Sequence, residues 1–190
     1  MPFIKSLPED AGPPQVFRLY PELYKAWSEM SQELMNGPSE LTPGERELFL
    51  AFAAGTAGCK FVYVAHSEVA YAWGVAPNLL ESLLVDPSLS TADPRLRPLL
   101  AFVRKLTLTP GEMSQADADA IFAAGWNEKT FHDVIAITAR MCFMQRMVEG
   151  FGFAPFPRDF AKIHAANRVK LGYVKLYPEL AGSGDYSDAH

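Results

Sequence analysis

Three side chains that can carry proton-transfer or thiol chemistry lie close together in the sequence: Glu47, Cys59 and His66. If a helix begins at Cys59, the thiol lies among the unpaired backbone amides at the positive end of the helix dipole. That position favours the thiolate and lowers the thiol pKa. His66 follows seven residues later, which places it about 20° from Cys59 around the helix axis. We therefore expect the thiol and the imidazole on one helix face, with Val62 between them.

Glu47 precedes this helix, and the chain that joins the two is small and flexible. Residues 51–58 are mostly alanine and glycine, so the helix that carries Glu47 can fold back tightly on the next one. A carboxylate, an imidazole and a thiol then meet in an apolar setting, where their pKa values shift toward neutrality. Glu47, Cys59 and His66 are the candidate catalytic residues. The alternative is structural, with Cys59 as a small buried apolar side chain and His66 as a surface residue.

Local signals predict the helices that position these residues. Apolar side chains recur at helical spacing over 17–35. Thr42-Pro43-Gly44-Glu45 is a capping box with proline at the first helical position, so a helix is predicted from there to about residue 54. The next helix is predicted to run from Cys59 to just before Gly74.

Capping residues and prolines predict more helices along the rest of the chain. They are expected over 77–84, 95–106, 114–124, 127–149 and 158–170. No segment shows sustained alternation of apolar and polar residues flanked by hairpin turns, so the predicted fold class is all-α. The proline-rich residues 1–16 are expected to form an irregular arm, and the small, polar residues 182–190 a mobile tail.

Length, composition and charge narrow the class of protein. The 190 residues suit a single domain over 1–190, and 49% hydrophobic with 21% charged residues is an ordinary globular composition. A net charge of −5 argues against nucleic acid and anionic membranes as partners. The sequence shows neither a signal-peptide pattern at its start nor an apolar run that could span a membrane, so a cytoplasmic location is expected.

Other polar residues give weaker signals. His132 and His164 are isolated, and solvated or structural roles are favoured for both. Arg140 and Arg146 can bind a substrate carboxylate, although arginines on a long helix more often form surface ion pairs. Cys142, on the longest predicted helix, is interpreted as a buried structural thiol. The sequence contains no metal-ligand or nucleotide-binding motif, so neither a metal nor a cofactor is expected.

The spacing Glu-x11-Cys-x-x-Cys-x-x-x-His is the signature of AhpD-like hydroperoxidases, and this chain has Glu47, Cys59, Val62 and His66 at the four positions. The segment LTPGERE over 41–47, which ends at Glu47, is also similar to the corresponding segment of these proteins, as are segments near 99–106 and 145–152. On these residues the chain resembles the AhpD-like / carboxymuconolactone decarboxylase superfamily, in its peroxidase-related branch. The resemblance covers about 15–155 and leaves 156–190 as a C-terminal extension. It implies an AhpD-like helical bundle that forms a homo-oligomer and acts on a small-molecule substrate.

Val62 stands where the family has its second cysteine, the residue usually taken to attack peroxide. A disulfide cycle within the motif is therefore impossible, and three functions stay open. The first is acid–base chemistry of the decarboxylase type, in which Glu47 and His66 act on a small organic acid or lactone. The second is a one-cysteine thiol peroxidase in which Cys59 is oxidised and an external thiol resolves the sulfenic acid. The third is a non-catalytic binding member of the family.

Overall fold

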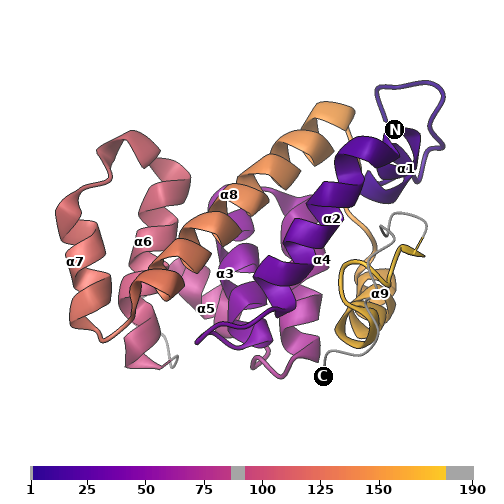
Figure 1. Cartoon of the computed structure of the whole chain (residues 1–190). Coiled ribbons are helices and arrows are strands. Elements are labelled where there is room, and N and C mark those ends of the chain that lie inside the picture. Colours follow the sequence, from indigo (N-terminus) through magenta and orange to yellow (C-terminus); the bar gives the residue numbers. More distant parts are fainter. Residues whose placement is uncertain (1, 87–92, 179–190) are drawn as a thin grey trace.

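The computed structural model describes residues 2–86 and 93–178, and within these ranges all regular structure is helical. The α-helices are α1 (Pro13–Leu19), α2 (Pro21–Asn36), α3 (Pro43–Thr56), α4 (Lys60–Ala72), α5 (Leu79–Val85), α6 (Arg97–Leu108), α7 (Gln115–Ala123), α8 (Glu128–Phe151) and α9 (Arg158–Leu171). Short 3-10 turns, η2 (Pro94–Leu96) and η3 (Pro110–Glu112), flank α6. Figure 1 shows α6 and α7 at one end of the molecule and α9 at the other, with α3 and α4 between them. The predicted all-α class is confirmed.

The hairpin of α3 and α4 forms the centre of the molecule (Figure 1). Thr42 caps α3 as the sequence predicts: its Oγ1 accepts the Glu45 N–H at 3.2 Å, and the Glu45 carboxylate accepts the Thr42 N–H at 2.7 Å. Gly58 then has a φ of +73°, a left-handed conformation that only glycine adopts at little cost. The chain reverses there, and Cys59 becomes the N-cap of α4. The link between the two helices is thus only a few residues long.

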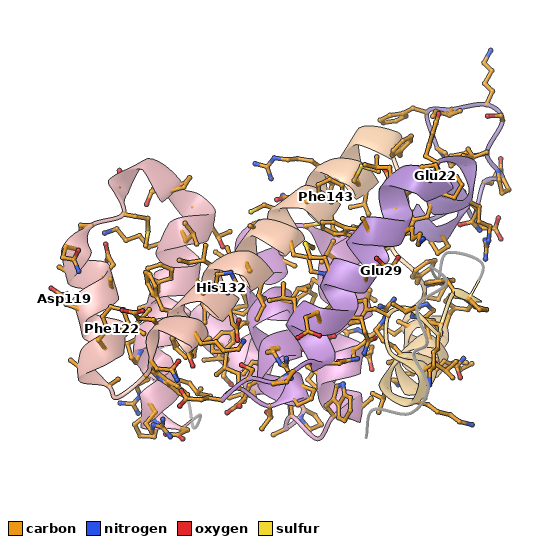
Figure 2. All side chains as sticks on the ribbon, in the orientation of Figure 1. Glu22, Glu29, Asp119, Phe122, His132 and Phe143 are labelled. Atoms are coloured by element: carbon orange, nitrogen blue, oxygen red, sulfur yellow. The ribbon has the colours of Figure 1, made fainter. Side chains whose placement is uncertain are left out.

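Aromatic side chains join α6, α7 and α8 at the end of the molecule opposite α9, where Figure 2 labels Phe122. The ring of Phe131 on α8 lies 5.2 Å from that of Phe102 on α6 and 5.4 Å from that of Phe122 on α7, measured between centroids. Separations and tilts of this kind are the favourable arrangements for aromatic pairs. This end of the bundle is an apolar support for α8 and carries no part of the candidate site.

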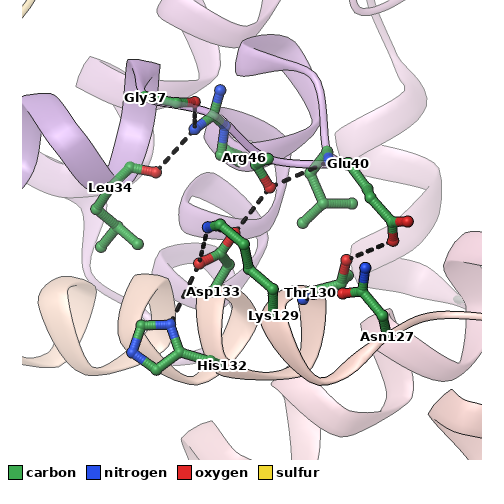
Figure 3. A network of polar contacts seen from close by, with 11 residues as sticks. Leu34, Gly37, Glu40, Arg46, Asn127, Lys129, Thr130, His132 and Asp133 are labelled. Carbon is green, nitrogen blue, oxygen red and sulfur yellow. Dashed lines mark hydrogen bonds and ion pairs between the residues drawn. The ribbon is translucent and has the colours of Figure 1, made fainter.

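A polar network fixes the first turns of α8 against the link between α2 and α3 (Figure 3). Asp133 accepts hydrogen bonds from Lys129 Nζ at 3.0 Å and from Ser39 Oγ at 2.8 Å. Thr130 donates to a Glu40 carboxylate oxygen at 2.9 Å. Because α8 also packs against α3 and α4, these contacts define which of its residues face the interior further along the helix.

The N-terminal part of the chain differs from the prediction. The sequence predicts an irregular arm over 1–16 and one helix over 17–35, but α1 already begins at Pro13 and ends at Leu19. Pro21 is the physical reason, because its ring clashes with a helix continued through this point and suits the first helical position, where α2 begins. The predicted tail over 182–190 lies outside the described residues. The single domain over 1–190 stays a prediction.

The C-terminal segment, α9 with the turn that follows it, packs on the central hairpin. Contacts between α9 and α4 are extensive, and Ala161 and Ala165 are buried in them. After α9 the chain turns toward α2, where the Tyr173 N–H donates to Gln32 Oε1 at 2.7 Å. Within 2–86 and 93–178, no helix has the length and apolar character needed to cross a membrane.

Candidate functional site

Glu47 and His66 meet in the interior, between α3 and α4. Nδ1 of His66 lies 2.6 Å from Oε2 of Glu47, and the two residues are only 8% and 1% exposed. The other carboxylate oxygen, Oε1, accepts a 2.6 Å hydrogen bond from the hydroxyl of Tyr173. The carboxylate and the imidazole therefore make the contact that the tight hairpin predicts, and Tyr173 holds the carboxylate from its far side.

The pKa values of this pair favour a carboxylate beside a neutral imidazole. Burial opposes the charge on Glu47, but the charge and hydrogen bond of His66 and the hydrogen bond of Tyr173 outweigh it, so its pKa lies below the usual value. Burial lowers the pKa of His66, and the charges of Arg140 and Arg168 lower it further. The charge and the hydrogen bond of Glu47 raise it, but by less. With Nδ1–H donated to Glu47, Nε2 carries the free lone pair of the ring.

A cavity of about 90 Å³ lies beside His66, between the central hairpin, α2, α8 and the C-terminal segment. Its wall is largely aromatic and apolar, with a few charged and hydroxyl groups. The lining residues are Pro13, Pro14, Phe17, Trp27, Ser28, Ser31, Phe61, Val62, Ala65, His66, Arg140, Met144, Phe156, His164, Arg168, Tyr173 and Tyr177. A concave, largely apolar pocket with a few convergent polar groups is the usual form of a small-molecule site.

Cys59 is not among the residues that line this cavity, whereas Val62 is. The thiol is buried, at 1% exposure, and burial raises its pKa to about 11, with a further contribution from the carboxylate of Glu149. The lowered pKa expected at a helix start is therefore wrong, because desolvation and Glu149 outweigh the nearby amides. Both cysteines are free thiols, and Cys142 is half-buried on α8.

Two arginines bring positive charge to the cavity. The guanidinium of Arg140, from α8, lies 4.7 Å from the ring centroid of Tyr173, and that of Arg168, from α9, lies 4.2 Å from it. Arg140 also donates Nε–H to Ser31 Oγ at 3.0 Å. Of the two arginines considered in the sequence, Arg140 is in the cavity, while Arg146 is exposed and donates to the Cys142 carbonyl.

The sequence predicts the C-terminal segment only as an extension, whereas the structure shows that it contributes residues to the site. Tyr173 contacts Glu47, and His164 lines the cavity with its Nε2 2.8 Å from the Tyr177 hydroxyl. A signal was present: His164 and Arg168 are four residues apart, so they lie on one face of the predicted helix. The spacing of Tyr173 and Glu47, 126 residues apart, carries no such signal.

The described residues show no arrangement suited to a bound metal ion. In the part of the chain that the structure describes, no group of three or more His, Cys, Asp or Glu side chains is arranged to hold one. At the candidate site the carboxylate of Glu47 is already engaged on both oxygens, by His66 and by Tyr173. Both oxygens of this carboxylate are therefore held by donors of the protein itself.

Comparison with known proteins identifies the fold. No protein-family model matches the chain, and no curated protein does. Among solved structures, it is similar to the alkylhydroperoxidase AhpD core of an uncharacterized peroxidase-related protein from Ralstonia eutropha JMP134, with a TM-score of 0.70, 24% identity, and coverage of 80% of this chain and 78% of that one. An uncharacterized peroxidase-related protein from Silicibacter sp. TM1040 gives a TM-score of 0.65 and 23% identity, covering 80% and 90% of the two chains.

These similarities confirm the fold that the motif predicts. The chain has the AhpD-like all-α fold of peroxidase-related proteins. At this level of identity the match concerns the fold, and chemistry has to be argued from the site.

Proposed function

We propose that this protein is an enzyme that moves protons on a small organic acid or lactone, with His66 as the acid–base group. The observation that carries the proposal is the buried Glu47–His66 pair, 2.6 Å apart, beside a largely apolar cavity. Glu47 fixes the tautomer and the orientation of the ring, and Nε2 is the nitrogen left for a substrate. A positioned imidazole of this kind typically contributes 10²–10⁴-fold in rate.

The proposed chemistry passes through an enolate-like anion. When the group lost is a proton, Nε2 of neutral His66 accepts it, and the C–H electron pair enters the enolate. When the group lost is carbon dioxide, the C–C electron pair enters the enolate, and the carbon takes a proton from the imidazolium. Glu47 stabilises the imidazolium in both cases, and Tyr173 keeps the carboxylate in place. Solvent restores the proton that leaves with the product.

A second candidate is the one-cysteine thiol peroxidase, which the names of the structural neighbours favour over a decarboxylase. In that reaction the Cys59 thiolate attacks the peroxide O–O bond, gives a sulfenic acid and releases water or an alcohol, and an external thiol then reduces it. The geometry favours the acid–base reaction instead. Val62 replaces the second cysteine at the cavity, and Cys59 is buried away from the cavity lining with a raised pKa.

Proton exchange at carbon tests the proposal without a known substrate. The protein is incubated in D₂O with a panel of small oxo acids, unsaturated acids and carboxylated lactones, and NMR follows the loss of carbon-bound protons and the release of carbon dioxide. We expect turnover of at least one compound. His66→Asn and Glu47→Gln should each slow it by about 10²–10⁴-fold, while Cys59→Ala should change it by less than about threefold.

The matched control is His132→Asn, because the side chain of His132 is 74% exposed on α8 and lies outside the cavity. It should leave the rate unchanged. Loss of turnover in Cys59→Ala with retention in His66→Asn would mean that the thiol is the reacting group. Peroxide consumption that depends on Cys59, with no exchange at carbon, would replace the proposal by the peroxidase. If neither activity is found, the non-catalytic binding protein replaces both enzymes.

A further inference from the structure

We infer that Arg140 and Arg168 form a carboxylate-binding subsite in the cavity beside His66. The inference rests on the proposed function in one respect, since it states which group of the substrate is held and by which residues. It concerns binding, however, and binding can be measured without turnover.

The first observation is a buried guanidinium nitrogen that has no partner. Arg140 is 5% exposed, and its Nη1 makes no hydrogen bond to any described residue. Within the described ranges, the other buried side-chain nitrogen and oxygen atoms without a hydrogen-bond partner are Arg46 Nε and Thr56 Oγ1. Neither residue lines the cavity. A buried charged donor without an acceptor costs free energy, so its presence in a ligand-sized cavity indicates an acceptor supplied by the ligand.

The second observation is the charge of the cavity. Arg140 and Arg168 bring two positive charges, and no carboxylate is among the lining residues. The carboxylate of Glu47 contacts two of the lining residues, His66 and Tyr173, and both of its oxygens are engaged by them. Among the described groups at the site, one positive charge is therefore left over. A ligand with one negative charge neutralises it, and the low polarity of the wall strengthens that attraction.

The third observation is that Arg140 is held in a defined orientation. Ser31 Oγ accepts from its Nε at 3.0 Å, and the rings of Trp27 and Tyr173 lie 5.6 Å and 4.7 Å from its guanidinium carbon. A planar guanidinium fixed in this way presents its remaining N–H groups without loss of side-chain entropy. Carboxylates match that fork with two parallel hydrogen bonds, so a carboxylate is preferred over other small anions.

The subsite also explains how His66 can act as an acid. The charges of Arg140 and Arg168 disfavour the imidazolium, and a bound carboxylate cancels this effect. Binding of the anion should therefore be accompanied by proton uptake at His66, which prepares the ring to protonate a carbanion. Affinity for the anion should accordingly increase as the pH falls below about 6.5, the ordinary pKa of histidine.

Propionate and its neutral isostere propionamide are suitable probes, because both are small enough for a cavity of about 90 Å³. Binding is measured by NMR titration of the protein, with ionic strength held constant by sodium chloride. Propionate should bind at least about tenfold more tightly than propionamide. Arg140→Gln and Arg168→Gln should each remove most of that preference, and Arg140→Lys should restore only part of it.

Arg146→Gln is the matched control, since Arg146 is on the same helix but exposed. It should bind both probes as the wild type does. Equal affinity for propionate and propionamide in the wild type overturns the inference, as does an undiminished preference in both glutamine variants. If Arg140→Gln fails to fold, Arg168→Gln and the comparison of the two probes still decide the matter.

His66→Asn separates this inference from the proposed function. It should bind propionate with the same preference over propionamide as the wild type at pH 8, where the imidazole is neutral. Arginine-dependent binding without any proton exchange at carbon leaves the subsite standing and removes the proposed function. Exchange at carbon without any preference for the carboxylate removes the subsite and leaves the proposed function standing.

Discussion

The two nitrogens of His66 have different roles, and that difference defines the chemistry at the scale of the residue. Nδ1 is engaged with Glu47 at 2.6 Å, so the ring cannot turn and the neutral tautomer is set. Tyr173 binds the second oxygen of the same carboxylate, and its own pKa is raised by burial and by Glu47. It therefore stays a donor at neutral pH. The three groups form one chain of hydrogen bonds that ends at the cavity.

The thiols provide a prediction at the same scale. Because its pKa is about 11, only about one Cys59 thiol in a thousand is ionised at pH 8, and the group is buried. Cys142 is half-buried. We expect native protein to be alkylated at Cys142 faster than at Cys59. Mass spectrometry of the single-cysteine variants Cys59→Ser and Cys142→Ser measures the two rates. Faster labelling of Cys59 would show that its thiol is activated and would favour the peroxidase.

At the scale of the element, the α3–α4 hairpin is the feature that the sequence predicts best. Its capping box, its small link and its apolar faces are all local signals, and they place Glu47 near His66 without knowledge of the rest of the chain. The prediction of a lowered Cys59 pKa is wrong for the opposite reason. It depends on one helix alone, whereas the burial of the thiol and the carboxylate of Glu149, on α8, are set by the tertiary structure.

Gly58 tests how far the hairpin depends on its turn. Gly58 has a φ of +73°, and a Cβ added there meets nothing within 4 Å, so Gly58→Ala introduces backbone strain alone. We expect a loss of about 1–2 kcal/mol in the free energy of unfolding, measured with urea. Gly111→Ala is the matched control, because its Cβ also meets open space but its φ is not in the left-handed region. Equal effects of the two would mean that the turn conformation contributes nothing.

At the scale of the whole molecule, the site depends on contacts between distant segments. Tyr173 and Arg168 reach the α3–α4 hairpin from the C-terminal segment, and Arg140 reaches the same cavity from α8. A single sequence cannot show such pairings, because they depend on how the helices pack. The homo-oligomer implied by the family resemblance also stays a prediction. Two apolar side chains on helices that pack together are exposed to solvent: Leu23 on α2 by 63% and Phe143 on α8, labelled in Figure 2, by 38%.

The dependence of stability on pH is the prediction that involves the whole molecule. Burial lowers the pKa of His164 to about 4, and the charges of Arg168 and His66 contribute. In the unfolded chain its pKa is about 6.5. Between these values the unfolded state binds a proton that the native state does not, so native stability is fully present above about pH 6.5 and falls as the pH is lowered toward 4. For a partly exposed group, the loss should be about 1–3 kcal/mol.

Urea unfolding at pH 7, 5.5 and 4.5 isolates this effect when the protein is compared with His164→Gln. The glutamine can still hydrogen-bond the Tyr177 hydroxyl, which lies 2.8 Å from the histidine, but it cannot take up a proton. The stability advantage of the wild type over the variant should therefore shrink as the pH falls. Asn167→Ala, at an exposed position of the same helix, should keep the pH dependence of the wild type. Parallel profiles for wild type and His164→Gln would show that His164 stays accessible to protons in the native state, and that the C-terminal segment does not close the cavity as tightly as its contacts indicate.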